Sequence, residues 1–321
     1  MTSKPDTHSP PTTAAEAAAA SHASARLMHL STYAAVSVAS LLLLLKLFAW
    51  WRTGSLSMLS SFTDSVFDLV MSVANLFAVR YALKPADDDH RFGHNSIEDI
   101  AGLAQCAFIF AAMAMIVLQS IARLANPVAA LEHPGIGIAV SIIGMVITTV
   151  LVLFQTYVSR RTRSLVIAAD RLHYASDILF NLGVLAAFGL SGWGNIPWAD
   201  GAIAILIAFI VIWSNLPIGV RAFNNLMNRE MPDEEKSHIV ELVAGMPEIR
   251  GHHKLKTRYS GIKPFIQLHA EIDAALNFRE AHAIIDRLEN AILQRFPGAD
   301  VIVHPDPVDS SSQTTSRSTH A

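Results

Sequence analysis

The sequence predicts a polytopic α-helical membrane protein, in which six transmembrane helices precede a C-terminal α+β domain. Two observations lead to this fold class. The 321-residue chain is 52% hydrophobic and 16% charged, with a mean hydropathy of +0.37, which is too apolar for an ordinary soluble protein. From Pro232 onward the sequence becomes more polar and shows the periodicity of short helices and strands, as expected for a small soluble domain.

Six segments qualify as bilayer spans, because each approaches the roughly 20 mostly apolar residues that a helix needs to cross the hydrocarbon core. They cover residues 33–51, 59–81, 100–124, 136–158, 166–190 and 199–216. Lys46 interrupts the first span, but it lies near Trp50 and Trp51, so we expect its long side chain to extend to the interface.

Basic residues are concentrated in two of the loops between the spans. The loops after the second and fourth spans contain Arg80, Lys84, Arg91, Arg160, Arg161 and Arg163. The alternate loops contain only Arg52 and Arg123. Because loops on the cytoplasmic side carry the excess of Lys and Arg, we expect both termini and the C-terminal domain to be cytoplasmic.

The two ends of the chain have the composition of disordered segments. Residues 1–26 are rich in Ala, Ser, Thr and Pro, and the apolar run that follows is too long for the core of a cleaved signal peptide. Residues 309–321 are also polar. We therefore expect a cytoplasmic tail at 1–26, a transmembrane domain at 27–221, a C-terminal domain at 222–308 and a second tail.

The C-terminal domain is expected to have the order helix, strand, strand, helix, strand. Acidic residues after Pro232 indicate the start of a helix. Apolar and polar residues alternate in FIQLHAEID (265–273), the pattern of a half-buried strand, and a partner strand precedes the turn at Ser260 and Gly261. A helix that begins near Phe278 and a strand at 301–307 complete a domain whose small core gains from a metal or a partner subunit.

Four ionisable residues occur in two of the predicted spans, in pairs one helical turn apart. Asp64 and Asp68 lie in the second span, and His173 and Asp177 in the fifth. Residues at i and i+4 share a helix face, so each pair points in one direction. Placing such groups in a bilayer costs about 2.5–3.5 kcal/mol each, and they normally mark a pathway or a site.

These four side chains could instead be paired for structural reasons. That alternative needs cationic partners, and the two spans contain only Arg80 and Arg171, both toward the cytoplasmic end. Three carboxylates and an imidazole therefore predict a divalent metal site. Four N and O ligands suit zinc and do not exclude ferrous iron or cadmium, whereas calcium and magnesium prefer shells of oxygen alone.

Two further groups of His and Asp residues are candidates for metal sites, and a third feature is ambiguous. Asp87, His90 and His94 lie in the loop PADDDHRFGH, where the alternative is a solvated acidic loop. The C-terminal domain contains a dispersed set, for which the alternative is ordinary surface histidines, with His252 as a rival for one position: His253, His269, His282, His304 and Asp306. Asp170 could be a helix-end charge or a gateway contact.

Other classes of function find little support in the sequence. The single cysteine, Cys106, allows no internal disulfide and no Cys-based zinc site. The net charge of −3 gives no indication of a nucleic-acid partner. No Walker loop or nucleotide fingerprint is present, so any transport must draw on an ion gradient.

The paired motifs at 64/68 and 173/177, the loop PADDDHRFGH and the C-terminal HPDP closely resemble the cation diffusion facilitator family, in particular its bacterial zinc/ferrous-iron efflux transporters. The resemblance runs from about Leu27 to Pro307. It implies a homodimer in the bacterial inner membrane, with six membrane helices and a cytoplasmic ferredoxin-like domain, that exchanges metal for protons. It also implies that this domain binds metal and mediates dimerisation.

The resemblance also implies roles for individual residues. Asp64, Asp68, His173 and Asp177 would form the transport site, and Asp87, His90 and His94 a loop site. The dimer-domain metal cluster would consist of His253, His269, His282, His304 and Asp306, with Asp306 bridging.

Two departures from the family pattern affect the dimer seam. Close relatives carry a Lys near the start of the third helix and an Asp after the sixth, which form a charge interlock. Ser96 and Asn228 stand at the matching positions here, so we expect the interlock to be absent or replaced by a hydrogen bond. Pro305 stands where relatives often have Gln.

The function expected from these observations is proton-coupled export of a divalent cation by alternating access, and not an enzymatic one. Zinc is the expected substrate and regulatory ligand, with ferrous iron and cadmium as further substrates. Protons, membrane lipid and a second copy of the chain are the expected partners. The alternatives are a membrane metal sensor or receptor that binds without flux, and a membrane metalloenzyme, although the chain has no HExxH motif.

Overall fold

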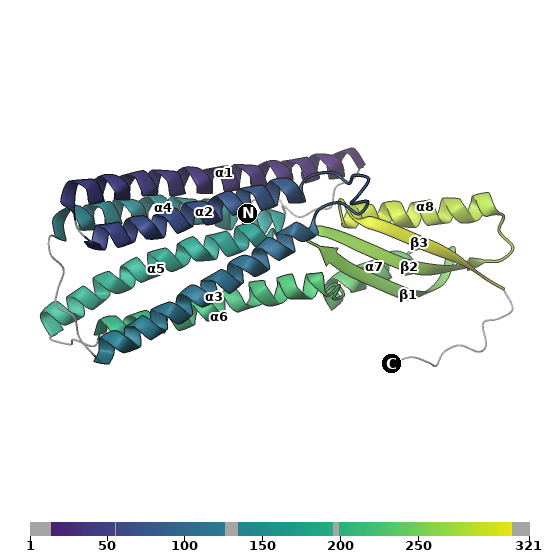
Figure 1. The fold of residues 1–321 in the computed structure, drawn as a ribbon. Helices are drawn as coiled ribbons and strands as arrows, with labels where there is room; N and C mark the ends of the chain where they lie inside the picture. Colours follow the sequence, from purple (N-terminus) through teal and green to yellow (C-terminus); the bar gives the residue numbers. More distant parts are fainter. Residues whose placement is uncertain (1–13, 55, 126–133, 195–198, 310–321) are drawn as a thin grey trace, which may run out of the picture. The chain divides into compact units, whose positions relative to one another are not determined.

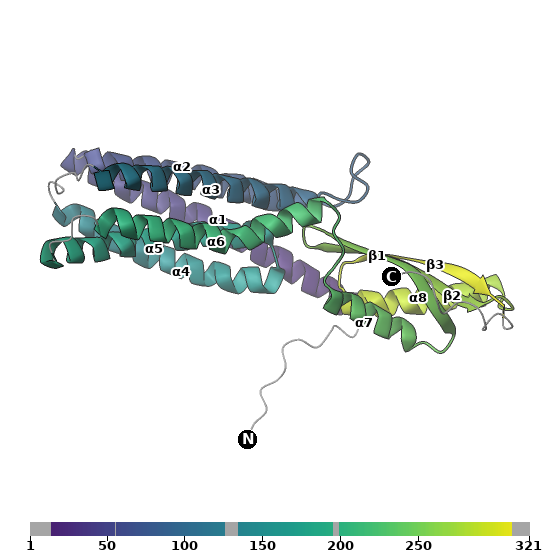
Figure 2. The same ribbon diagram turned by 90° about the horizontal axis from the view of Figure 1, so that it is seen from below.

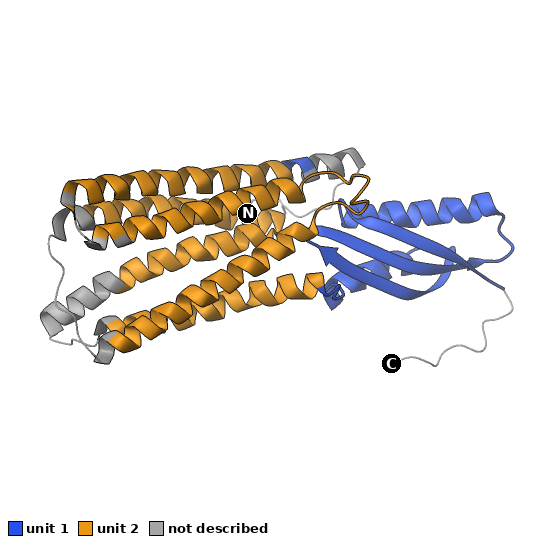
Figure 3. Cartoon of the chain, in the orientation of Figure 1, with its two compact units in different colours: residues 1–23, 227–321 blue, residues 24–226 orange. Residues whose placement is uncertain are grey.

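The computed structural model describes residues 14–54, 56–125, 134–194 and 199–309 of the chain. The chain divides into two compact units, which Figure 3 shows in different colours. Residues 24–226 form a helical unit, and the second unit contains the C-terminal domain, which starts at Met227.

Long helices make up most of the helical unit within the described residues (Figure 1). Their bounds are α1 (Ala14–Thr53), α2 (Leu56–Ala82), α3 (Ser96–Ala125), α4 (Pro134–Thr162), α5 (Leu165–Gly194) and α6 (Ala199–Leu226). In the described part of the chain, α1, α2, α3, α4 and α6 contain stretches long and apolar enough to cross a membrane. Helix α5 has a similar length but contains Asp170, Arg171 and Asp177 among its apolar residues.

Large apolar side chains cover the outside of this unit. Leu44, Val150, Leu153 and Trp213 are each at least 60% exposed. A soluble protein rarely exposes so many large apolar side chains, whereas a helix bundle in lipid does so as a rule. The predicted fold class, a polytopic helical membrane protein with a C-terminal α+β domain, is confirmed.

Two helix ends differ from those expected from the sequence. Helix α1 already begins at Ala14, inside the segment that the composition marked as a disordered tail. The run Ala17–Ala20 explains the difference, because alanine has the highest intrinsic helix propensity. Helix α6 continues through Pro217 to Leu226, so the domain boundary lies at Met227 rather than at residue 222. A proline removes one backbone hydrogen bond but need not end a helix.

The C-terminal domain has the predicted order helix, strand, strand, helix, strand. Its elements are α7 (Asp233–Ala244), β1 (Ile249–Ser260), β2 (Lys263–Asp273), α8 (Phe278–Arg295) and β3 (Asp300–Val308). The strands form one sheet in the order β1-β2-β3, in which β1 and β2 are antiparallel and β2 and β3 are parallel. Figure 2 shows the domain from below.

Helices α7 and α8 pack on one face of this sheet. In β2 the side chains of Ile266, Leu268, Ala270 and Ile272 are buried in a core shared with the two helices. The alternate residues, which include His269, point to the opposite face of the sheet and are less buried. The sheet therefore has a helix-covered face and an open face, and the polar residues of β2 lie on the open face.

The core of this domain should be sensitive to the loss of a single side chain. Leu288 of α8 is fully buried, so Leu288→Ala is expected to destabilise the domain by about 3 kcal/mol through lost burial and a residual cavity. Hydrogen exchange of β2 peptides in the full-length protein measures this loss. Phe278→Ala, at a side chain that is 85% exposed, is the control and should change stability by less than about 0.5 kcal/mol. Equal protection of β2 in the two variants would contradict the assigned core.

Candidate metal centres

Three of the four predicted intramembrane ligands come together between α2 and α5. Ligand atoms of Asp68, His173 and Asp177 all lie within 4.8 Å of one another. His173 Nε2 lies 3.0 Å from Asp68 Oδ1, and both side chains are 16% exposed. Because His173 and Asp177 are one turn apart on α5, both side chains face α2. The arrangement provides one imidazole and two carboxylates in a small volume, a donor set that fits zinc.

Asp64 lies one turn away from Asp68 on α2 and is exposed, outside the group of three. It still acts electrostatically on Asp177. Its direct ligation of a metal stays a prediction.

Lys46 of α1 is a neighbour of this site that the sequence reasoning missed. Its charge acts on both Asp64 and Asp177, and its side chain is half-buried rather than fully exposed. The second and fifth spans carry the ligands, whereas Lys46 approaches from the first. Membrane helices that are distant in sequence can contribute charge to one site, and no pattern within a single helix reveals it.

A layer of buried, hydrogen-bonded polar side chains lies next to the intramembrane group and includes Asp170. The Asp170 carboxylate is 3% exposed and accepts hydrogen bonds from Asn75 Nδ2 on α2, at 2.9 Å, and from Gln155 Nε2 on α4, at 2.6 Å. The hydroxyl groups of Ser72 and Tyr174 lie 2.7 Å apart. Asp170 is therefore an interhelical contact and not an exposed helix-end charge. Since it precedes His173 by one turn, its hydrogen bonds orient α5 at the metal group.

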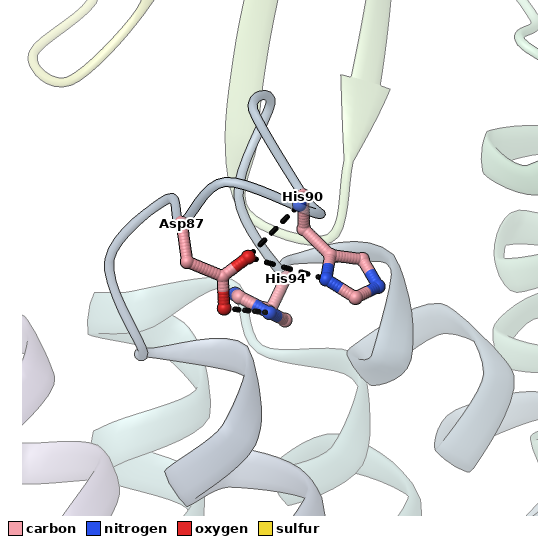
Figure 4. A group of neighbouring side chains, drawn as sticks. All are labelled: Asp87, His90 and His94. Carbon is pink, nitrogen blue, oxygen red and sulfur yellow. Dashed lines mark hydrogen bonds and ion pairs between the residues drawn. The ribbon is translucent and has the colours of Figure 1, made fainter.

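The loop between α2 and α3 forms a second group of three ligands, shown in Figure 4. Asp87 is at its centre. Its Oδ1 accepts a hydrogen bond from the His90 backbone N–H at 2.9 Å and lies 3.3 Å from His90 Nδ1, and its Oδ2 lies 3.3 Å from His94 Nε2. The Lys84 ammonium also donates to Oδ2, at 2.6 Å.

The electrostatics of this loop suit a cation. The hydrogen bond from Lys84, followed by that from the His90 backbone, holds the pKa of Asp87 well below its usual range, so the carboxylate stays ionised. His94 is buried, its ring meets that of Tyr81 edge-on, and neither ring nitrogen has a hydrogen-bond partner. Buried polar atoms are rarely left unsatisfied, and a bound metal would satisfy Nε2, the ring nitrogen that faces Asp87. The donor set, two imidazoles and one carboxylate, fits zinc.

The C-terminal domain holds a third group on the open face of its sheet. Strand register places His253 opposite His269 and His269 opposite His304, so three imidazoles form a row across the sheet. Asp306 contacts all three: its Oδ2 lies 2.9 Å from His253 Nε2 and 2.8 Å from His269 Nδ1, and its Oδ1 lies 3.1 Å from His304 Nε2. These contacts, led by the one with His269, lower the pKa of Asp306.

Two other histidines of this domain lie apart from the row. His282 of α8 is 64% exposed, lies 3.7 Å from Asp286 and stacks on Phe278. Its membership of the cluster stays a prediction. His252 pairs with Ala270, whose side chain is on the helix-covered face, so His253 and not His252 faces the cluster.

Asn228, which stands where close relatives carry the Asp of the charge interlock, forms a hydrogen bond within its own chain. Asn228 has a φ of +56° and accepts a hydrogen bond from Arg258 Nη1 at 3.2 Å. Asparagine tolerates this left-handed conformation better than most residues. Ser96 is the first residue of α3.

Comparison with known proteins identifies both parts of the chain. Residues 32–227 match the model of the cation efflux transmembrane domain, and residues 231–308 match that of the cation efflux protein cytoplasmic domain. The cation-efflux pump FieF of Escherichia coli O127:H6 is 45% identical over 284 residues, which cover 88% of this chain and 93% of that protein. FieF of Escherichia coli O1:K1 / APEC is 44% identical with the same coverage.

Two solved structures also resemble part of the chain. One is the zinc form of CzrB, a proposed zinc transporter, which is 33% identical in sequence over the matched residues and has a TM-score of 0.22. The match covers 24% of this chain and 90% of that one. A second CzrB structure is 32% identical, with a TM-score of 0.23 and coverage of 24% and 98%.

The relatives are cation-efflux pumps and not enzymes, and the matched domains account for both units described above. The chain therefore belongs to the cation efflux family, the cation diffusion facilitator family that its motifs resemble.

Proposed function

We propose that this member of the cation efflux family exports zinc in exchange for protons, with ferrous iron and cadmium as further substrates. The observation that carries the proposal is the convergence of Asp68, His173 and Asp177 inside two apolar helices. An imidazole and two carboxylates form the borderline ligand set that zinc prefers. Asp64 would complete the set from the next turn of α2.

Coupling to protons follows from the chemistry of these ligands. A metal binds only to neutral imidazole and ionised carboxylate, so metal and protons compete for the same lone pairs. Binding of the metal releases protons, and protonation expels the metal. If the site opens alternately to the two sides of the membrane, an inward proton gradient drives the metal outward.

Charge balance supports a dication as the substrate. When they bind a metal, Asp64, Asp68 and Asp177 must be ionised and provide three negative charges. Lys46, whose charge acts on Asp64 and Asp177, provides one positive charge nearby. With neutral His173 the net charge is about −2, which one divalent cation neutralises. A neutral occupied site lowers the cost of holding ions in a low-dielectric environment.

The location and assembly are part of the same proposal. The excess of basic residues in alternate loops favours cytoplasmic termini, in a bacterial inner membrane. We propose a homodimer in which the C-terminal domain binds zinc through His253, His269, His304 and Asp306, with His282 as a further ligand. Metal binding there would regulate transport only by favouring one conformation over another.

Transport should depend on the intramembrane group and on the pH gradient. In proteoliposomes with an enclosed zinc dye, His173→Ala and Asp177→Ala are each expected to lower zinc flux to below about 10% of the unsubstituted rate, because each removes a ligand from a buried site. Asp88→Ala, at a loop side chain that is 93% exposed, should leave the flux unchanged.

The dependence of zinc flux on the pH gradient is the second part of this test. Collapsing the pH gradient with an ionophore should abolish uphill zinc movement. Flux that is independent of the gradient would contradict proton exchange, and metal binding without any flux would indicate a sensor or receptor.

The loop group should bind zinc more tightly when its competing cation is removed. The Lys84 ammonium forms an ion pair with Asp87 Oδ2 and so competes with a metal for this oxygen. Lys84→Met is therefore expected to raise zinc affinity by about two- to five-fold, which corresponds to the free energy of an exposed ion pair. The pKa of Asp87 would return toward its usual value, near 4, which still leaves the carboxylate ionised at pH 7. Zinc titration in a background with His173→Ala and His269→Ala measures the change.

Arg91→Met is the matched control for Lys84→Met. It removes one positive charge from the same loop, but Arg91 pairs with Asp88 and not with Asp87. An equal gain in both variants would mean that net charge, and not access to Asp87, limits binding.

Zinc affinity of the loop should also fall on acidification, because imidazole must be neutral to bind metal. The low pKa of Asp87 means that its carboxylate does not contribute to this pH dependence.

A further inference from the structure

Glu271 lies beside the C-terminal cluster but was not among its expected ligands. In the register of the sheet it pairs with Gly251 on one side and Asp306 on the other, in the row next to the three imidazoles. It follows His269 by two residues in β2, so both side chains point to the open face. A third carboxylate on this face, Asp273, follows two residues later and pairs with Arg250.

The two ring nitrogens of His253 contact two different carboxylates. Nδ1 lies 3.2 Å from Glu271 Oε1, and Nε2 lies 2.9 Å from Asp306 Oδ2. A neutral imidazole has one N–H and one lone pair. A carboxylate that accepts the Nδ1–H leaves the lone pair on Nε2, the nitrogen that faces Asp306. Carboxylate partners of this kind commonly orient metal-binding histidines.

Gly251 provides the space that the Glu271 carboxylate occupies. A Cβ added at residue 251 would lie 2.5 Å from Glu271 Oε2 and 3.2 Å from Glu271 Cδ. Any side chain at this position would therefore force the Glu271 carboxylate to move from its place beside His253. Glycine is unfavourable inside a strand, and a close approach of another group is a common reason for finding one there.

We infer that Glu271 is a positioning residue for metal at the C-terminal cluster, that it fixes the ring of His253 with Nε2 toward the metal, and that Gly251 makes room for it. The inference rests on the proposed metal binding by this cluster. It gives Glu271 no role as a ligand, since its contact is with the nitrogen of His253 that faces away from Asp306.

The test uses the full-length protein with His173→Ala and His94→Ala, so that the C-terminal cluster is the intact one of the three described groups. Zinc affinity is measured by competition with a chromophoric chelator, and Co²⁺ absorption reports the geometry of the bound metal. Glu271→Ala is expected to weaken zinc binding by about 10- to 100-fold, the usual cost of losing such a partner. Glu271→Gln should recover part of the loss, because its amide oxygen can still accept the Nδ1–H.

Asp273→Ala is the matched control, because it removes the same charge from the same face of β2 without touching His253. It should change zinc affinity by less than about two-fold, within the range of a screened surface charge. An effect as large as that of Glu271→Ala would overturn the inference in favour of simple charge. An effect of Glu271→Ala below about two-fold would overturn it directly.

Gly251→Ala tests whether Gly251 makes room for the Glu271 carboxylate. Because glycine has no side chain, this substitution removes no metal ligand. It should weaken zinc binding and alter the Co²⁺ spectrum in the same way as Glu271→Ala. The double variant should be no weaker than Glu271→Ala alone, since both act through one carboxylate. Additive losses would contradict the role assigned to Gly251.

His269→Ala separates this inference from the proposed function. If zinc binding in the test background survives His269→Ala, the metal cluster itself is wrong. If His269→Ala abolishes binding and Glu271→Ala does not weaken it, the cluster is correct and the positioning role is wrong. Hydrogen exchange of β2 peptides in each variant verifies that the domain is folded.

Discussion

Charge compensation among Asp68, His173 and Asp177 is the constraint on which the helical unit depends. Carboxylates that share a small apolar volume repel one another unless protons or a cation neutralise them. Helices α2 and α5 both carry carboxylates within a span-like length, and two side chains of α5 meet partners on α2: Asp170 contacts Asn75, and His173 contacts Asp68. Either protons or a metal ion can neutralise these carboxylates. The two can therefore replace one another at this group.

The buried layer around Asp170 is the structural counterpart of this group. Its carboxylate needs donors because no water is available in an apolar interior, and the amides of Asn75 and Gln155 supply them from α2 and α4. These hydrogen bonds are directional, so they define how α5 is rotated against its neighbours. The rotation decides whether His173 faces Asp68.

Three ligand groups with similar chemistry lie in very different surroundings. The intramembrane group lies between apolar helices, the loop group combines a buried His94 with exposed side chains, and the C-terminal group lies on the open face of a sheet. The same donors exchange metal more easily where water can replace a ligand. The local environment, more than the identity of the ligands, therefore separates a site for transport from one for capture or regulation.

Local patterns in the sequence predicted much of this arrangement, and contacts between distant segments were the part that they could not predict. The spacing of His173 and Asp177 identified one helix face, and alternation in β2 identified the strand that carries His269. Lys46 and Asn75 reach their sites from other helices, and Glu271 of β2 contacts His253 on the neighbouring strand β1. No periodicity within one element reveals such contacts.

Zinc-edge X-ray absorption of protein with His94→Ala and His269→Ala tests the central claim most directly. The account predicts four N/O ligands and imidazole scattering that disappears in His173→Ala. A shell of six oxygens, or a spectrum unchanged by His173→Ala, would contradict it.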